Sequence, residues 1–307
     1  MAILGAGATG KALACFLQRG HNEVCLIAKK SQLQQLAKGI TVSGFIKGSF
    51  KPQVCDAKHS SLFLRKAEFL IVAVKAYDTI AAIESIKGSL RDETSVVSLQ
   101  NGFDSFHNLR RAGLRNIVSG ITTLAVTPLS ASRIRIVTGG KTLLGSVDGI
   151  AAEGVSKFNS ILNSSGLKSY VSSNIMKEIW LKGIANSCIN PLTALLHVTN
   201  GVLVEQPALR ELVSVLCGEA VSIAHAEDLS LKKPQCVRRV LSICRSTYGN
   251  RSSMLVDIER GKRTEIESLN GYLCRIAERH SISADGLRSL LLLVRASERR
   301  SLEAAGL

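Results

Sequence analysis

The chain has 307 residues, of which 46% are hydrophobic and 21% are charged, a balance that is ordinary for a globular protein. It has no apolar run of about 18 residues, which excludes a membrane-spanning helix, and its length favours two domains over one hydrophobic core. The net charge is +15, but the basic residues are dispersed and only 4% of residues are aromatic. We therefore expect no nucleic-acid partner, although the charge can attract small anions.

The first half of the chain alternates strand-like and helix-like segments. The predicted strands are 2–4, 23–28, 69–74, 95–99 and 116–119. The predicted helices between them are 8–19, 79–87 and 103–111. Apolar strands separated by helices predict a parallel sheet that is covered on both faces. From residue 121 to about residue 144 short β segments follow, including 133–138 and 142–144, and we expect them to extend this sheet.

The second half is helical after one further strand-like segment, 167–171, which leads to Asn174 as the predicted N-cap of a helix. The longer helical segments are 202–223, 237–245, 266–280 and 287–305. We predict an α/β fold with an N-terminal Rossmann-type, doubly wound parallel sheet and a C-terminal all-α domain. The predicted domains are 1–171 and 172–307.

Cysteine and histidine give no sign of disulfides or of a metal site. The eight cysteines form no CxxC motif and lie mostly among apolar residues, so we expect reduced thiols. The six histidines show no HxxxH spacing, and we predict no bound metal. The chain enters a strand directly after Met1 without the pattern of a secretory leader, which predicts a cytoplasmic location. Because that strand is short, the true start of the chain could also lie slightly upstream.

A glycine-rich turn follows the first strand. Gly5, Ala6, Gly7, Ala8, Thr9 and Gly10 fit the pattern GxGxxG between a strand and a helix. In that context the glycines allow a tight turn, close approach of a pyrophosphate and close packing of the helix on the sheet. The helix N-terminus supplies an anion site. The alternative is a strand-to-helix turn with incidental glycines.

The end of the second strand indicates which dinucleotide binds. NAD-binding chains place a carboxylate there for the ribose 2′-hydroxyl, whereas this chain has Lys29 and Lys30. Two ammonium groups suit a 2′-phosphate, so we predict NADP(H), with Lys29 favoured over Lys30 as the contact. The alternative is a pair of ordinary surface lysines.

Lys182, Asn186 and Asn190 are spaced four residues apart in an otherwise apolar helical segment. Side chains at this spacing stack on one face of a helix, about 6 Å apart along the axis. A buried ammonium and two buried amides are costly unless something pairs with them. The group therefore indicates a cleft with a polar ligand, although Lys182 could instead reach solvent beside two structural amides.

These motifs together resemble the ketopantoate reductase (2-dehydropantoate 2-reductase) family, over nearly the whole chain. The resemblance rests on segments 5–10, 74–76, 100–102, 180–194 and 252–271. The two most specific are the Lys/Asn/Asn-Pro helix and the later Ser-Ser-Met…Asp…Thr-Glu-Ile segment.

The resemblance implies an NADPH-dependent reduction of 2-dehydropantoate to pantoate, toward pantothenate and coenzyme A. It assigns Lys182 as the catalytic lysine and Glu265 as a catalytic carboxylate. The matching substrate-binding positions are Asn101, Asn186, Asn190, Ser253 and Lys75. Lys75 and Asn101 also match positions near the cofactor, and Lys29 stands where the family commonly has an arginine.

The same assignment has a physical basis in the reaction. Hydride transfer to a ketone leaves negative charge on oxygen, which calls for a proton donor and for groups that fix the substrate carboxylate. Lys182 is the best donor, and burial would lower its pKa while a neighbouring Glu265 would raise it. From sequence alone, however, the favoured reading of Glu265 is a surface residue that pairs with Lys262 or Arg263, and Ser253 caps a helix as easily as it binds a carboxylate.

Three rival functions stay open: reduction of another 2-oxo acid, a catalytically silent NADP-binding regulator, and a basic nucleic-acid-binding protein. The partners we expect are a small 2-oxo acid and, at most, a second copy of the chain, so the protein is a monomer or a homodimer.

Overall fold

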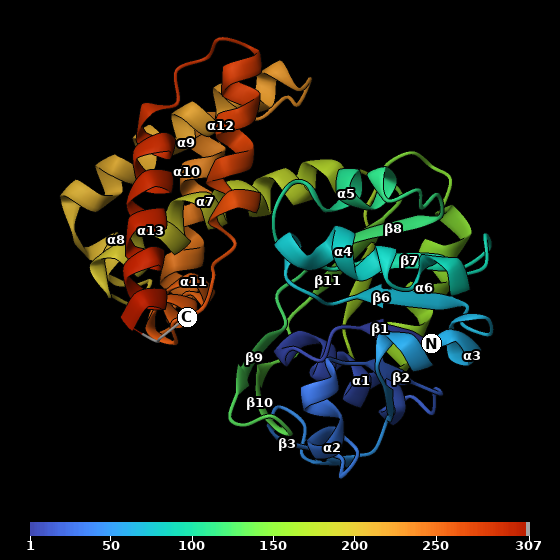
Figure 1. Cartoon of the computed structure of the whole chain (residues 1–307). Coiled ribbons are helices and arrows are strands. Elements are labelled where there is room, and N and C mark those ends of the chain that lie inside the picture. Colours follow the sequence, from blue (N-terminus) through green and yellow to red (C-terminus); the bar gives the residue numbers. More distant parts are fainter. Residues whose placement is uncertain (305–307) are drawn as a thin grey trace. The chain divides into compact units, whose positions relative to one another are not determined.

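The computed structural model describes residues 1–304, which form two compact units (Figure 1). The first unit comprises Met1–Gln100 and Asp104–Glu178, and the second comprises Asn101–Phe103 and the chain from Ile179 onward. The first unit therefore extends past residue 171, where the sequence places the domain boundary. The short segment Asn101–Phe103 belongs to the second unit although both of its sequence neighbours belong to the first.

An eight-stranded sheet forms the centre of the first unit, in the order β12-β11-β8-β7-β6-β1-β2-β5. Its strands are β1 (Ala2–Leu4), β2 (Cys25–Ile27), β5 (Gln53–Cys55), β6 (Phe69–Val72), β7 (Ser95–Ser98), β8 (Ile117–Thr122), β11 (Thr142–Gly145) and β12 (Ser169–Val171). Neighbouring strands are parallel except for β11, which runs antiparallel to β8. The predicted Rossmann-type sheet is confirmed.

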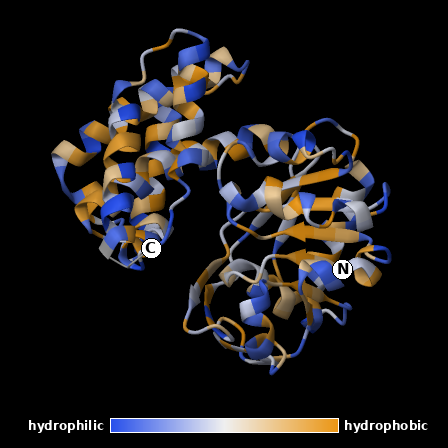
Figure 2. Ribbon diagram, viewed as in Figure 1, coloured by the Kyte–Doolittle hydropathy of each residue, from blue (hydrophilic) through white to orange (hydrophobic). Residues whose placement is uncertain are grey.

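Helices cover both faces of this sheet because successive residues of each strand point to opposite sides. Ile3 packs in a core with residues of α1 (Ala8–Arg19) and α6 (Ala152–Ser164). Its neighbours Ala2 and Leu4 pack in the opposite core, with residues of three shorter helices: α3 (Ser61–Leu64), α4 (Thr79–Glu84) and α5 (Ser105–Arg111). The central strands are apolar along their length, as Figure 2 shows.

The expectation that residues 133–138 extend this sheet is wrong. They form β10 (Arg133–Thr138) in a separate four-stranded sheet with β4 (Gly48–Phe50), β3 (Ile40–Gly44) and β9 (Ala125–Pro128). In β10 the buried Ile134 and Ile136 alternate with exposed residues, and this single apolar face packs against α1. Only β11 adds to the main sheet. Strands 40–44, 48–50 and 53–55 were not predicted from the sequence.

Short helical turns connect these elements. They are η1 (Lys30–Gln32), α2 (Leu33–Leu36), η2 (Ala57–His59), η3 (Ala76–Asp78) and η4 (Lys87–Ser89).

The second unit is helical, as predicted. Its helices are α7 (Ile175–Leu196), α8 (Val202–Glu205), α9 (Pro207–Ala226), α10 (Lys233–Ser246), α11 (Ser253–Glu259), the 3-10 turn η5 (Ile266–Ser268), α12 (Asn270–Arg279) and α13 (Asp285–Ala304). Helix α9 packs against α8, α10, α12 and α13. The predicted end of the last helix, residue 305, lies outside the described residues. None of the helices within residues 1–304 is both long enough and apolar enough to cross a membrane.

Helix α7 begins where the sequence predicts, because the Oδ1 atom of Asn174 accepts a hydrogen bond of 2.9 Å from the backbone N–H of Lys177. Its first residues, to Glu178, belong to the first unit and the rest to the second. The helix continues through Pro191 to Leu196.

Candidate active site

Two glycines of the β1–α1 turn are required by close packing within the first unit. Gly5 has a φ of +112°, and a Cβ atom there would lie 2.8 Å from the carbonyl carbon of Ala73. A Cβ atom at Gly10 would lie 2.0 Å from the carbonyl oxygen of Gly5. Helix α1 can therefore approach the strand ends this closely only with glycine at both positions.

Gly7 differs, because the protein itself leaves room for a side chain there. A Cβ atom at Gly7 would have Ala73 O as its nearest neighbour at 3.8 Å, and the backbone φ of −68° suits any residue. Gly7 is the N-cap of α1, and no side chain caps the first N–H groups of the helix there. The packing of the protein does not require glycine at position 7, whereas close approach of a ligand pyrophosphate to the backbone would. Ala6, Ala8 and Thr9 belong to the same turn.

The two lysines after β2 have different surroundings. Both are exposed, and Lys29 is the N-cap of η1. Lys30 lies close enough to Asp56, at the end of the neighbouring strand β5, to contribute to the lowered pKa of that carboxyl; the largest cause is a hydrogen bond from His59. Lys29 remains the predicted phosphate contact.

Lys75 lies in the loop after β6, as the N-cap of η3. This loop is held by Gln100 at the end of β7. The Nε2 atom of Gln100 donates to the carbonyl oxygen of Val74 at 2.7 Å and to the hydroxyl of the buried Thr79 at 2.8 Å. Gln100 therefore positions the Lys75 loop, a role that was not assigned from the sequence.

In the second unit, Lys182, Asn186 and Asn190 lie on one helix, α7, with the predicted spacing. Asn190 is buried, and the other two side chains are half-buried among apolar neighbours. Burial lowers the pKa of Lys182 to about 8, and the negative charge of Glu265 acts in the opposite direction. Lys182 is thus an ammonium group that can release its proton near neutral pH.

Glu265 is buried, with only 9% of its surface exposed, rather than lying free on the surface. It directly precedes η5, and Asn101 donates a hydrogen bond of 3.4 Å from Nδ2 to its Oε2 atom. The preceding residue, Thr264, donates from its backbone N–H to Oε1 of Glu298 at 2.9 Å and from its hydroxyl to Oε2. The second unit therefore brings Lys182, Glu265 and Asn101 together.

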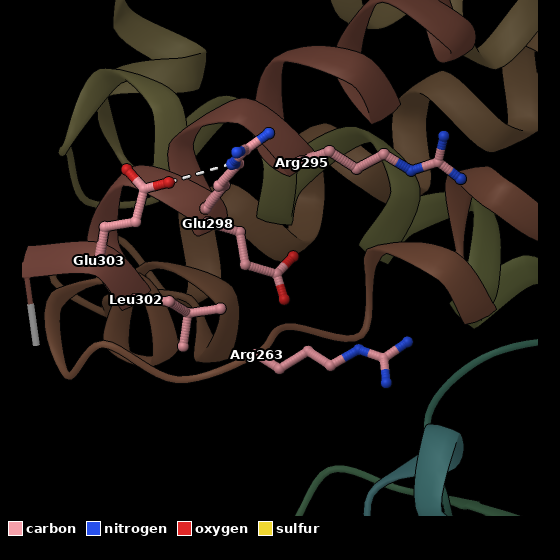
Figure 3. A pocket seen from close by; sticks show the side chains of 6 residues that line it. Arg263, Arg295, Glu298, Leu302 and Glu303 are labelled. Atoms are coloured by element: carbon pink, nitrogen blue, oxygen red, sulfur yellow. Dashed lines mark hydrogen bonds and ion pairs between the residues drawn. The ribbon is translucent and has the colours of Figure 1, made fainter. Parts of the chain in front are cut away.

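Glu298 also lines a surface hollow of about 420 Å³ on helix α13, shown in Figure 3. Its lining includes Arg263, Arg295 and Arg299. Arg295 donates to Glu267 at 2.6 Å, and Arg299 donates to Glu303 at 3.0 Å. Arg295 and Arg299 are thus paired with carboxylates and Glu298 accepts hydrogen bonds from Thr264, so we do not count the hollow as part of the candidate site.

Ser253 is not the cap of helix α11. Its neighbour Ser252 takes that role, accepting from the N–H of Leu255 at 3.1 Å and a hydrogen bond of 2.8 Å from the Thr193 hydroxyl. Ser253 is exposed as the first residue of the helix. This leaves its hydroxyl available in the role that the family resemblance implies, which stays a prediction.

Sequence reasoning missed an aromatic cluster beside Lys182. The ring of Phe103 stacks on Tyr272 with centroids 5.4 Å apart and meets Trp180 at 5.0 Å. The sequence instead predicts Phe103 as the start of a helix, which actually begins at Ser105. The available signal was that Trp180, the one tryptophan of the chain, lies two residues before Lys182.

Comparison with known proteins accounts for both halves of the chain. Residues 1–149 match the family model described as ketopantoate reductase PanE/ApbA, and residues 174–298 match its C-terminal model. The 2-dehydropantoate 2-reductase of Archaeoglobus fulgidus is 32% identical over 296 residues, which cover 96% of this chain and 97% of the relative.

Two solved structures are similar along their whole length. A PanE/ApbA family ketopantoate reductase from Ralstonia eutropha is 26% identical, with a TM-score of 0.87 and 98% of each chain covered. A D-mandelate dehydrogenase, solved with NADH and anilino(oxo)acetate, is 23% identical, with a TM-score of 0.91 and 98% of each chain covered. The latter likeness shows a shared fold.

These findings confirm the predicted fold class and the prediction of an oxidoreductase, and the predicted NADP(H) dependence agrees with them. The chain belongs to the ketopantoate reductase family, as its Lys/Asn/Asn-Pro helix and its Thr-Glu-Ile segment predict.

Proposed function

We propose that the chain reduces 2-dehydropantoate to pantoate with NADPH, a step toward pantothenate and coenzyme A, and that Lys182 is the general acid. The observation that carries this proposal is Lys182 itself: a half-buried ammonium whose pKa is lowered to about 8, beside the buried carboxylate Glu265. Relatives that are named 2-dehydropantoate 2-reductase support the choice of substrate.

The first unit suits the cofactor. Gly7 and the N-terminus of α1 would hold the pyrophosphate, with Ala6, Ala8 and Thr9 beside it, and Lys29 would hold the 2′-phosphate. When bound, NADPH supplies the hydride. Lys75, whose loop Gln100 fixes, adds a positive charge at the carboxyl end of the sheet, where open α/β folds bind their ligands.

The second unit supplies the proton and orients the substrate. Lys182 donates its proton to the oxygen that becomes the new hydroxyl and stabilises the negative charge that develops there. Glu265 holds the lysine and accepts a hydrogen bond from a substrate hydroxyl, while Asn101, Asn186, Asn190 and Ser253 offer polar groups for the carboxylate and the hydroxyl. The proton donor is regenerated from solvent.

Substrate preference tests the proposal. We expect kcat/KM with NADPH to be higher for 2-dehydropantoate than for pyruvate or 2-oxoisovalerate. Of these three, only 2-dehydropantoate carries a hydroxyl that can donate a hydrogen bond to Glu265. A preference for another 2-oxo acid would favour the alternative of a related reductase. Binding of NADPH without any turnover would favour a silent regulator.

Replacing Lys29 by alanine should raise the KM for NADPH about tenfold, because one charge-assisted contact to the 2′-phosphate is lost. The KM for NADH should stay nearly unchanged, since NADH lacks that phosphate. Lys30→Ala is the matched control and should have the smaller effect, because Lys30 interacts with Asp56. A larger effect of Lys30→Ala would show that the wrong lysine was assigned.

The pH dependence of kcat should report Lys182. A general acid must be protonated, so the rate of reduction should fall as the pH rises through about 8. The rate of the reverse oxidation should rise over the same range, because that direction needs the unprotonated lysine. Glu265 raises this pKa, so Glu265→Gln should move both transitions to lower pH. A transition that stays in place in Glu265→Gln would mean that another group titrates.

The predicted state of monomer or homodimer and the cytoplasmic location remain predictions.

A further inference from the structure

The segment Asn101–Phe103 is a short piece of chain that leaves the first unit, packs within the second unit and returns. Gln100 and Asp104, on either side, belong to the first unit. Gly102 makes this excursion possible, since its φ of +104° is a conformation that favours glycine.

Two hydrogen bonds fasten this segment to the turn that carries Glu265. Asn101 donates to the Glu265 carboxylate at 3.4 Å, and the backbone N–H of Phe103 donates to the carbonyl oxygen of Ser268 at 3.2 Å. Glu265 and Ser268 are in turn joined, because the N–H of Ser268 donates to the carbonyl oxygen of Glu265 at 3.1 Å. The segment is therefore hydrogen-bonded to both ends of the turn from Glu265 to Ser268.

The ring of Phe103 holds the segment in place. Only 3% of its surface is exposed, and the ring is stacked on Tyr272 and meets the edge of Trp180. It also lies directly on the backbone of Gly183, where a Cβ atom would fall 2.4 Å from both its Cε1 and its Cζ atoms. Gly183 immediately follows Lys182, so one ring contacts the helix of the lysine and anchors the segment that binds the carboxylate.

We propose that Phe103 is a positioning residue for the reaction: its ring, packed on Gly183 between Trp180 and Tyr272, fixes the Asn101–Phe103 segment and thereby sets Glu265 against Lys182. The kinetic part of this inference rests on the proposed function. The structural part does not, because it concerns the packing of one ring.

Trp180 provides a direct readout of the ring, since it is the only tryptophan in the sequence and is buried. Phe103→Leu removes the ring, so water should reach Trp180 and its fluorescence emission should shift to the red. Phe158→Leu is the matched control, because Phe158 is a buried aromatic residue that packs on Phe69 in the first unit, with ring centroids 5.2 Å apart. It should lower the melting temperature and leave the emission unchanged.

The kinetic readout separates positioning from simple packing. In Phe103→Leu we expect kcat to fall about ten- to a hundredfold, because misplacement of a catalytic group by about 1 Å has effects of this size. Glu265, the charged group that acts on Lys182, would be held less firmly, and water would enter around the lysine. The loss of burial should raise the pKa of Lys182 more than the weaker hold on Glu265 lowers it. The pH at which kcat falls should therefore be higher in Phe103→Leu, whereas Phe158→Leu should leave it unchanged.

A second pair of variants tests the contact with Gly183. Gly183→Ala should displace the ring and reproduce the emission and pH shifts, whereas Gly218→Ala should not, since the nearest atom there is the flexible end of Lys233 at 3.3 Å. Leucine lacks the Cε1 and Cζ atoms, which the new methyl would meet most closely, at 2.4 Å. The double variant Phe103→Leu/Gly183→Ala should therefore be no slower than either single variant.

The inference fails if a folded Phe103→Leu variant keeps the wild-type emission, or if its emission shifts while kcat and the pH profile stay the same. Additive losses in the double variant would also contradict it. If Phe103→Leu does not fold, Phe103→Met retains a long apolar side chain and carries the same two readouts. If the wild-type protein turns over no 2-oxo acid, the proposed function fails, and the emission measurements still decide whether Phe103 anchors the segment.

Discussion

Replacing Lys182 by alanine should lower kcat for 2-dehydropantoate by about 10²–10⁴-fold, the range typical for loss of a positioned general acid. Binding of NADPH should be unaffected, because the glycine-rich turn, Lys29 and Lys75 belong to the first unit and Lys182 is not among the residues assigned to the cofactor. Steady-state kinetics and a fluorescence titration with NADPH measure the two quantities separately.

Two further variants make this test specific. Lys177→Ala removes a lysine from an earlier turn of the same helix and should leave kcat unchanged. Lys182→Arg keeps the positive charge, but a guanidinium does not give up its proton at working pH, so this variant should remain slow. Near-normal turnover by Lys182→Ala, or wild-type turnover by Lys182→Arg, would show that Lys182 is not the general acid.

Alanine at Gly10 and at Gly7 should have different consequences. At Gly10 the new Cβ would overlap the carbonyl oxygen of Gly5, at 2.0 Å, so α1 must shift. We expect a loss of about 1–3 kcal/mol in the free energy of unfolding and an NADPH affinity that is at least about a hundredfold lower. Chemical denaturation and NADPH titration measure these effects.

Gly7→Ala is the matched variant. The nearest protein atom would be 3.8 Å away, so the free energy of unfolding should stay near that of the wild type. The methyl would instead occupy space needed by the pyrophosphate, so NADPH affinity should fall about tenfold or more, equivalent to about 1.4 kcal/mol. Unchanged NADPH affinity in a folded Gly7→Ala variant would mean that the dinucleotide does not approach this turn.

The sequence predicted the local elements of the fold better than the long-range pairings. The strand at 2–4 and the helix at 8–19 were predicted to the residue, because a glycine bounds each of them. The pairing of β10 with β3 was missed, since these strands are far apart in the sequence and β3 was not predicted as a strand. The alternation in 133–138 indicated a strand with one buried face but not which neighbour it joins.

In the candidate site, too, local features could be predicted and long-range contacts could not. The spacing of Lys182, Asn186 and Asn190 follows from helical geometry, so their common face could be predicted. The burial of Glu265 could not, because it depends on Thr264 bonding to Glu298 on the last helix and on Asn101 from a distant segment. Phe103 was missed for a related reason: its neighbours predict a helix, whereas its ring packs with Trp180 and Tyr272.

One measurement tests the central claim most directly: the purified protein is incubated with NADPH and 2-dehydropantoate, and the NADPH consumed is compared with the pantoate formed. We expect one pantoate for each NADPH oxidised, at a rate that falls as the pH rises through about 8. Oxidation of NADPH without pantoate, or no oxidation with this substrate while another 2-oxo acid is reduced, would contradict the proposed function.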